Sequence, residues 1–533
     1  MNRSVGLLTA TLLSVGACSI LNSTEDLKPV PAVGGASDSA GKSNTSTSGK
    51  SAGGSDGGAD ATPAGAGAGA GTGTVGMGGC GVDCSEGGAP PIGAACTDSA
   101  TDCASTAPIC DATAGECRAC ATNQECQDEV GKDYCLTTGA TAGRCAVCQT
   151  NSDCSGKTPV CNNLGVCRAC SSDDECDSGV CQPSGACAAP ATVVYALAET
   201  GISGTPCGGI DTPCRNLSDA TGQLGKLRPN LVLIKTVKKF NTGAAFPAVQ
   251  GLRVIGNGVA VHPYDGATGF QVPAGADVTF DNVVIEGSTA KDQAGIACTG
   301  GAVTVTNSLL RDNAVAVRAT DCDMTVALSR LEHNAAPLEY GNSALISTCT
   351  VASCDKITSV LRNRFVDNGV AINFADQAKA SIENNLFLRN GSSGYTRVIE
   401  LRSDATHFAY NTLVENFNDC TYVGIVACDA GTCSNVANVS YNNFPNPPGG
   451  TPCPDQVWYG GTLTYSLTEA TYPGSTNKSG DPLFVDAANG DFTPGPGSPA
   501  LDKGDPNDVP PFDINGHKRP LGAGPDMGAF ESP

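Results

Sequence analysis

The sequence predicts an all-β protein whose main part is a parallel β-helix, preceded by a disulfide-rich modular region and a disordered tether. Three observations predict this. A six-residue phrase (Asn or Ser, any residue, a large apolar residue, any two residues, then Asn or Gly) recurs between residues 277 and 444. Cysteines in regular quartets precede these repeats, and a tract of Gly, Ala, Ser and Thr precedes the cysteines.

The recurring phrase predicts a solenoid with one coil per repeat, because its instances start 21 to 34 residues apart. It lies in runs of alternating polarity such as 303–306, so one set of side chains should face the interior. We expect its closing Asn or Gly at corners of positive φ. The third positions should stack along one interior wall: Val284, Leu310, Leu331, Phe365, Phe387 and Leu413.

The coils and three C-terminal segments, 480–486, 497–502 and 525–531, carry a resemblance to a known family. The coils resemble the right-handed parallel β-helix proteins of the pectin-lyase-like superfamily. The three segments look like the terminal part of bacterial surface proteins of the choice-of-anchor Q type. This resemblance covers residues 191–533 and implies a right-handed β-helix with a C-terminal cap, at a cell surface. It implies no particular activity, since the superfamily contains enzymes and proteins of other roles.

Residues 1–17 are expected to be a lipoprotein signal peptide. Arg3 precedes an apolar run over 5–13, which is too short to span a bilayer and ends near the tetrapeptide Val-Gly-Ala-Cys of a lipobox. Cys18 is then the lipidated first residue of the mature chain, with a plain secretory signal as the alternative. Because residue 19 is Ser rather than Asp, we expect a lipid anchor at the outer membrane or cell surface; secretion is the alternative.

Residues 18–79 are expected to form a flexible tether. Their composition of Gly, Ala, Ser and Thr offers too little apolar surface for a folded core. A random coil of about 50 residues spans roughly 40 Å between its ends. The tract therefore acts as a spacer.

Residues 80–190 are expected to be an array of small disulfide modules with almost no apolar core. Four cysteines allow three connectivities, so the pairing within a quartet stays open. Zinc binding is the less favoured alternative, because the region has no His and the chain is exported. Such modules resemble those of surface proteins, where they serve as stalks or protein contacts. The quartets are Cys96, Cys103, Cys110, Cys117; Cys120, Cys126, Cys135, Cys145; Cys148, Cys154, Cys161, Cys167; and Cys170, Cys176, Cys181, Cys187. Two further local pairs are expected, Cys207 with Cys214 and Cys349 with Cys354.

The formal net charge of −22 argues against nucleic acid and anionic lipid as partners. The only membrane contact expected is through the N-terminal lipid. An anionic polysaccharide would be repelled unless a cation bridged it. Lys235, Lys238 and Lys239 are the local exception; a solvated strand edge is favoured there over a sugar-acid site.

The fifth positions of the phrases define a candidate groove: Glu286, Asp312, His333, Asp367, Arg389 and Glu415. Such a column could bind calcium or supply acid and base groups, although a solvated outer face is the simpler interpretation. Lys356 is a candidate lyase base. Trp458 and Tyr459 are candidates for sugar stacking, against the favoured alternative of closing the core. No cofactor or metal site is predicted, apart from possible calcium.

The leading functional hypothesis is a surface lipoprotein whose β-helix binds glycans or surface proteins without catalysis. The alternative is a polysaccharide lyase or glycoside hydrolase, so whether the chain is an enzyme stays open. The motif series of polygalacturonases is absent, and no set of base, cation ligands and sugar-binding groups converges. A weaker third hypothesis gives the partner-binding role to the cysteine modules.

Overall fold

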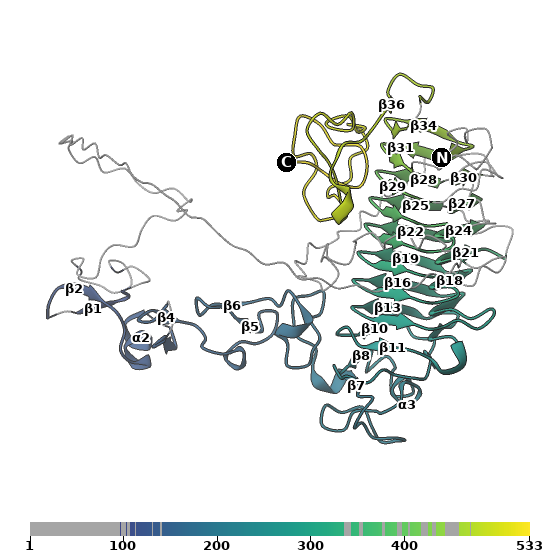
Figure 1. Cartoon of the computed structure of the whole chain (residues 1–533). Coiled ribbons are helices and arrows are strands. Elements are labelled where there is room, and N and C mark those ends of the chain that lie inside the picture. The colour runs from purple at the N-terminus through teal and green to yellow at the C-terminus, as the bar shows by residue number, and fades with distance from the viewer. Residues whose placement is uncertain are drawn as a thin grey trace, which may run out of the picture. The chain divides into compact units, whose positions relative to one another are not determined.

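The structure is a computed structural model of the chain (Figure 1). It describes residues 96, 103, 107–111, 113–130, 132–138, 141–334, 343–350, 355–375, 379–391, 397–402, 406–416, 425–428, 433–442, 458–469 and 471–533. The predicted signal peptide, Cys18 and the tether over 18–79 lie outside these residues. The chain divides into two compact units: one ends at Cys145, and the other begins at Ala146 and contains the solenoid. Among the described helices, none is long and apolar enough to cross a membrane.

The cysteine region is built from short elements held by disulfides. In the unit that ends at Cys145 these are β1 (Ile109–Asp111), β2 (Glu116–Arg118), α2 (Asn123–Val130) and β3 (Tyr134–Cys135), with β4 (Cys145–Ala146) at its boundary. The following unit begins with 3-10 turns at Asn151–Asp153 and Asp173–Glu175 and with β5 (Val160–Cys161) and β6 (Cys167–Arg168). The predicted disulfide-rich region is confirmed.

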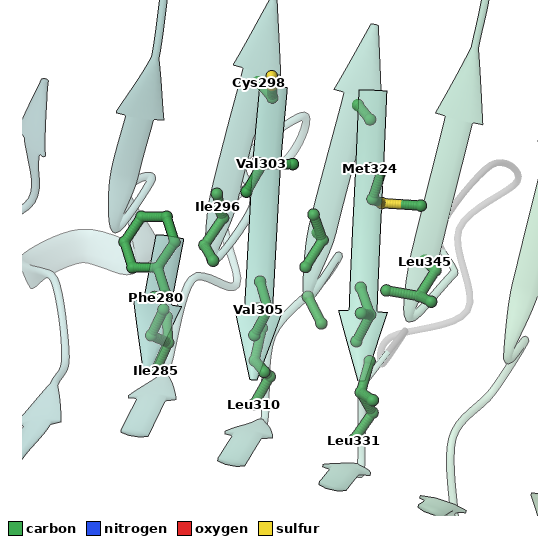
Figure 2. Close-up of a cluster of buried hydrophobic side chains, with 14 of the residues drawn as sticks. Phe280, Ile285, Ile296, Cys298, Val303, Val305, Leu310, Met324, Leu331 and Leu345 are labelled. Atoms are coloured by element: carbon green, nitrogen blue, oxygen red, sulfur yellow. The ribbon is translucent and has the colours of Figure 1, made fainter. Parts of the chain in front are cut away.

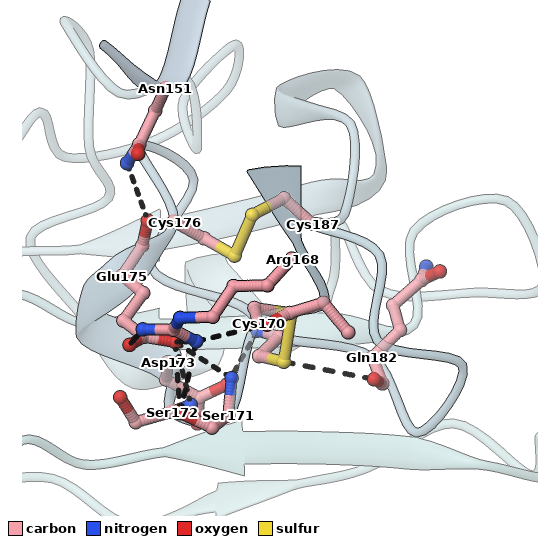
Figure 3. The surroundings of a disulfide bond; sticks show 12 residues. Asn151, Arg168, Cys170, Ser171, Ser172, Asp173, Glu175, Cys176, Gln182 and Cys187 are labelled. Atoms are coloured by element: carbon pink, nitrogen blue, oxygen red, sulfur yellow. Dashed lines mark hydrogen bonds and ion pairs between the residues drawn. A yellow bond between two sulfur atoms is a disulfide. The ribbon is translucent and has the colours of Figure 1, made fainter. Parts of the chain in front are cut away.

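In every quartet the first cysteine is bonded to the third and the second to the fourth. The pairs are Cys96–Cys110, Cys103–Cys117, Cys120–Cys135, Cys126–Cys145, Cys148–Cys161, Cys154–Cys167, Cys170–Cys181 and Cys176–Cys187. Three sulfur atoms of each quartet lie within 4.8 Å of one another, and these disulfide bonds account for their closeness. Figure 3 shows the Cys176–Cys187 bond beside the ion pair of Arg168 with Glu175.

The solenoid consists of three parallel sheets, and each coil contributes one strand to each sheet. We number them sheets 1, 2 and 3 in the order in which a coil visits them. Sheet 1 has 11 strands: β7 (Val193–Ala196), β8 (Asn230–Leu233), β10 (Leu252–Ile255), β13 (Asp277–Asp281), β16 (Ala302–Thr306), β19 (Asp323–Ala327), β22 (Ile357–Leu361), β25 (Lys379–Glu383), β28 (Thr406–Ala409), β31 (Cys433–Val436) and β34 (Thr462–Thr464).

Sheet 2 has 10 strands: β11 (Ala260–Val261), β14 (Val284–Glu286), β17 (Leu309–Arg311), β20 (Arg330–Glu332), β23 (Arg364–Val366), β26 (Leu386–Leu388), β29 (Thr412–Val414), β32 (Val439–Tyr441), β35 (Leu467–Thr468) and β36 (Lys478–Ser479). Sheet 3 has 9: β9 (Ala244–Ala245), β12 (Phe270–Val272), β15 (Ile296–Thr299), β18 (Val317–Thr320), β21 (Leu345–Thr348), β24 (Ile372–Ala375), β27 (Ile399–Arg402), β30 (Val426–Cys428) and β33 (Trp458–Tyr459). The stacked coils confirm the predicted all-β parallel β-helix (Figure 1).

Few elements lie outside the three sheets. α3 (Leu217–Thr221) buries Leu217 and Ala220 against the first coils. Short 3-10 turns occur at Pro190–Thr192, Tyr264–Gly266 and Ala487–Asn489, and β37 (Phe484–Asp486) pairs with β38 (Asp491–Pro494) in an antiparallel ribbon. The predicted pair Cys207–Cys214 is present. Cys349 is disulfide-bonded, whereas Cys354 lies outside the described residues. Cys298–Cys322 and Cys428–Cys433 bridge within the solenoid.

The interior column forms as predicted except in its first member. Val284 pairs with Leu309 and is only half-buried, whereas Ile285 pairs with Leu310 and is fully buried. Figure 2 shows Ile285, Leu310 and Leu331 in one row inside the coils. The first phrase was therefore aligned one residue too early, because Asn282 occupies the turn position before the phrase, as Asn307 does one coil later.

The closing asparagines do not have the positive φ that the sequence predicted. The residue before each of them does: φ is 53° at Asp312 and 52° at Arg389. The asparagines Asn313, Asn334, Asn368, Asn390 and Asn416 are instead buried, and each amide oxygen accepts the backbone N–H of the residue one coil earlier. These side chains satisfy N–H groups that the corner would otherwise leave unpaired in the core.

The C-terminal segment packs along the outer face of sheet 2. Phe492 and Phe530 join the buried cluster of Leu386 and Leu388, and the Ala529 N–H donates to the Thr412 Oγ1 at 2.9 Å. Inside the segment, a buried ion pair joins Arg519 Nη1 and Glu531 Oε2 at 3.1 Å. Sheet 2 is therefore covered over its later coils, while its earlier coils carry charged side chains.

Candidate functional site

The structure places most of the predicted groove column at one corner of the coils. Asp312, His333, Asp367, Arg389 and Glu415 each directly follow a strand of sheet 2, at positive φ. Glu286 is not in this column: it pairs with Arg311 in the ladder of sheet 2 and is buried. The one-residue shift of the first phrase explains the difference.

Glu286 is the buried anionic centre of an ion-pair cluster whose cationic partners are partly exposed. Its carboxylate contacts the Lys239 ammonium, the Arg311 Nε at 2.8 Å and the His262 Nδ1 at 3.5 Å. Burial acts to raise the pKa of the Glu286 carboxyl, but hydrogen bonds from Lys239 and Arg311 outweigh it and hold the pKa below its usual value. Lys239, part of the basic cluster seen in the sequence, is thus held in an internal ion pair.

Three members of the corner column interact with one another. Arg389 binds Asp367 through two hydrogen bonds of 2.8 and 2.9 Å, and the His333 Nε2 lies 3.9 Å from the same carboxylate. The hydrogen bond with Asp367 raises the pKa of Arg389. Both oxygens of Asp367 are therefore already engaged, which leaves Asp312 and Glu415 as the exposed carboxylates of the column.

The other predicted site residues lie elsewhere in the coils. Lys356 precedes β22 of sheet 1, and its Nζ is 3.3 Å from the Asp323 Oδ2, so it belongs to a different corner from the groove column. Trp458 is buried in the core, 5.7 Å from the Phe408 ring centroid, and offers no face on the surface. The side chain of Tyr459 is outside the described part of the structure.

The outer face of sheet 1 presents a site that the sequence reasoning missed. Five strands in succession place a hydroxyl side chain at the same outward position, and we call this set the hydroxyl row. Strand register aligns its members one coil after another, on β13, β16, β19, β22 and β25. They are Thr279, Thr304, Thr325, Ser359 and Ser381.

Two ion pairs mark the ends of the hydroxyl row. On the strand before Thr279, Arg253 binds the last cysteine module, through the Cys181 carbonyl at 2.9 Å and the Asp173 Oδ2 at 3.4 Å. On the strand after Ser381, the His407 Nε2 lies 3.1 Å from the Asp508 Oδ2 of the C-terminal segment. The row is therefore the part of this face that lies between two covering segments.

The hydroxyls of the row are available to a ligand. In the part of the chain that the structure describes, the side chains of Thr279, Thr304, Thr325 and Ser359 form no hydrogen bond, whereas Ser381 donates to Glu383. All five side chains are partly exposed. Strands spaced about 4.8 Å apart make the row about 19 Å long. Each hydroxyl can both donate and accept, so the row can bind a neutral polar chain.

The outward positions were visible in the sequence as the threonines of alternating runs such as Val303-Thr-Val-Thr306. Their alignment was also present there, because Thr304, Thr325, Ser359 and Ser381 each stand four residues before the first residue of a recurring phrase. Thr325 and Ser359 lie 34 residues apart, the same separation as the phrases that follow them, and they pair directly.

The outer face of sheet 3 holds a smaller polar set. Asn373 and Glu400 are register partners on β24 and β27, and Arg318 lies on β18 of the same face. The Glu400 carboxylate lies between the Arg397 Nη1 at 3.0 Å and the Arg402 Nη2 at 2.5 Å. This set combines a carboxylate, guanidinium groups and an amide on one face.

No family model matches the chain, and no curated protein does. Among solved structures, the crystal structure of pectate lyase Pel9A is similar over 64% of this chain and 96% of that chain, at 16% sequence identity and a TM-score of 0.38. At this TM-score the likeness carries no argument about activity, and the β-helix assignment rests on the strand pairing.

Proposed function

We propose that this chain is a cell-surface lipoprotein whose β-helix binds glycan chains, or other envelope partners, without cleaving them. The hydroxyl row carries the proposal. It repeats one neutral, hydrogen-bonding group per coil along a straight and rigid face, which suits an extended polymer better than a small molecule.

A neutral glycan is the best match for this row. Its five members carry no charge, so a neutral chain avoids the repulsion that a net charge of −22 imposes on an anionic one. Each hydrogen bond contributes only about 1 kcal/mol net, so useful affinity needs several coils to act together. The regular spacing of the coils supplies that repetition.

Affinity electrophoresis of the full chain, with disulfides intact, tests the proposal against a panel of neutral polysaccharides such as a β-glucan, a mannan and a xylan. The double variant Thr304→Val/Thr325→Val keeps side-chain shape and strand propensity but removes two hydroxyls. At about 1 kcal/mol each, we expect about a 30-fold loss of affinity. Thr299→Val, an exposed threonine on sheet 3, is the matched control. Equal retention of the double variant and the wild type would overturn the proposal.

A polysaccharide lyase or glycoside hydrolase is the second candidate function, and the set around Glu400 favours it. The same samples should be examined for shortened chains and unsaturated sugar ends. Their appearance, and their loss in Glu400→Gln, would replace a binding role with a catalytic one on sheet 3. Without them the non-enzymatic proposal stands.

The lipid anchor has its own test. Wild-type chain should partition into the detergent phase of a membrane extract, whereas Cys18→Ser should stay in the aqueous phase. Partition of both into the aqueous phase would leave the chain secreted and not anchored.

A further inference from the structure

Arginines gather on the outer face of sheet 2, in a chain that is otherwise strongly acidic. Arg330 and Arg364 are register partners on the adjacent strands β20 and β23. Arg362 lies two residues before Arg364, at a corner where φ is 59°. We call these three residues the arginine cluster. Like charges on paired strands repel each other, so this arrangement calls for a compensating anion.

Among the described residues, a carboxylate forms an ion pair with only one of the three arginines. The Arg330 Nε is 2.6 Å from the Glu332 Oε2. Over the described residues, neither Arg362 nor Arg364 has a carboxylate within ion-pair distance. The Arg362 Nε is buried without a hydrogen-bond partner. Two guanidinium groups are thus left without a carboxylate in direct contact among the described residues.

The C-terminal segment covers the cluster from the other side. The Arg364 Nη2 donates to the Asn515 Oδ1 at 2.8 Å, and its guanidinium lies 5.9 Å from the Phe530 ring centroid. The Arg362 guanidinium lies 5.9 Å from the Phe512 ring centroid. A Cβ at Gly516 would come within 3.0 Å of the Arg362 Nη2, so the loop backbone approaches that group closely.

The nearest acidic residue of this loop, Asp513, is committed to its own segment. It is fully buried, its oxygens accept the backbone N–H groups of His517 and Glu531, and its Oδ2 lies 3.2 Å from the His517 Nδ1. Burial, and then the charge of Arg330, lower the pKa of Arg364 to about 10, and the charge of Asp513 opposes them only in part. The surroundings therefore disfavour the charged guanidinium, and a bound anion would reverse that.

We propose that the arginine cluster and the loop over 512–516 form a binding site for an oxyanion group, a carboxylate, sulfate or phosphate. The planar, two-pronged guanidinium matches such a group with paired hydrogen bonds. The site lies on sheet 2, and does not depend on the hydroxyl row of sheet 1. It gives an otherwise acidic surface one place where an acidic saccharide or a free anion is held.

Isothermal titration calorimetry on the full chain tests this site with three probes: an oligoglucuronate, inorganic sulfate, and a neutral oligosaccharide of equal length. We expect the two anionic probes to bind and the neutral one not to bind at this site. Tighter binding of the oligoglucuronate than of sulfate assigns the site to an acidic glycan, whereas equal binding assigns it to small anions.

The variant Arg364→Gln should weaken anion binding at least 10-fold, and Lys503→Gln is its control. Lys503 is exposed on the same C-terminal segment, so its variant has the same net charge. Since Arg364 also contacts Asn515 and Phe530, Arg362→Gln serves as a second variant: over the described residues its side chain makes no hydrogen bond and only the ring contact with Phe512. Unchanged urea unfolding of this variant checks that the segment stays docked. Absence of anion binding in the wild type, or equal weakening by Lys503→Gln, would overturn the proposal.

Discussion

The buried corner asparagines Asn313, Asn334, Asn368, Asn390 and Asn416 bond from coil to coil, and we call them the ladder asparagines. Removal of one of them measures how much the corners of the β-helix depend on these side chains. Asn390 is fully buried. Its Oδ1 accepts the backbone N–H of Asn368 at 3.1 Å, and its Nδ2 donates to the Phe365 carbonyl at 2.9 Å and to the Asn416 Oδ1 at 3.0 Å. Asn390→Ala removes these bonds from the Asn368 N–H and the Phe365 carbonyl inside the core, whereas the Asn416 Oδ1 still accepts the backbone N–H of residue 390.

The expected cost follows from those lost partners. Each buried polar group left unpaired costs about 1–3 kcal/mol, so the variant should lose at least about 2 kcal/mol of unfolding free energy. Urea unfolding followed by the fluorescence of Trp458 reports on this core, because it is the only tryptophan and is buried in the stack. Asn507→Ala, at an exposed asparagine, is the control and should change stability by less than about 0.5 kcal/mol. A loss below about 1 kcal/mol in Asn390→Ala would refute the ladder as a stabilising network.

Two further predictions concern charge and disulfides. Lys239 and Arg311 hold the pKa of Glu286 in the folded chain below its value in the unfolded chain. The ionised Glu286 therefore stabilises the fold at pH values above the unfolded pKa, and this contribution is lost as the pH falls through the folded pKa. Glu286→Gln should therefore destabilise the chain at pH 7 but much less at pH 3, in urea titrations at both pH values; equal losses would contradict this. Replacing Cys176 and Cys187 together by Ser should cost about 2–4 kcal/mol, seen as faster proteolysis of the last module, and unchanged proteolysis would contradict it.

Alternation and repetition were enough to predict the coils. Runs such as 303–306 alternate because one face of each strand is buried, and this constraint acts on every coil alike. The interior positions Leu310, Leu331, Phe365, Phe387 and Leu413 were predicted correctly for that reason. The prediction failed in the first coil because Asn282 satisfies the phrase, whereas the residue equivalent to Ser308 is Val283, which does not; only pairing with the next coil reveals the correct alignment.

The candidate site was predicted less well, because it depends on contacts between distant residues. Asp367 and Arg389 are 22 residues apart and form a bidentate pair. Their equivalent positions in the phrase place them in one column, but only the structure shows that they bind each other. Thr325 and Ser359 each stand four residues before a recurring phrase, but only the structure shows that this position lies in a continuous exposed row. The arginine cluster was not visible in the sequence, since the loop over 512–516 that covers it comes about 150 residues later.

The sequence by itself determined the all-β class, the coil repeat and the disulfide-rich region, because these follow from local alternation and cysteine spacing. The tertiary structure alone decided the connectivity of the quartets, the buried role of the ladder asparagines and the place of the C-terminal segment on sheet 2. Those properties depend on which side chains meet across coils. A linear sequence pattern does not predict such contacts, because insertions of variable length change the sequence separation of residues that pair in space.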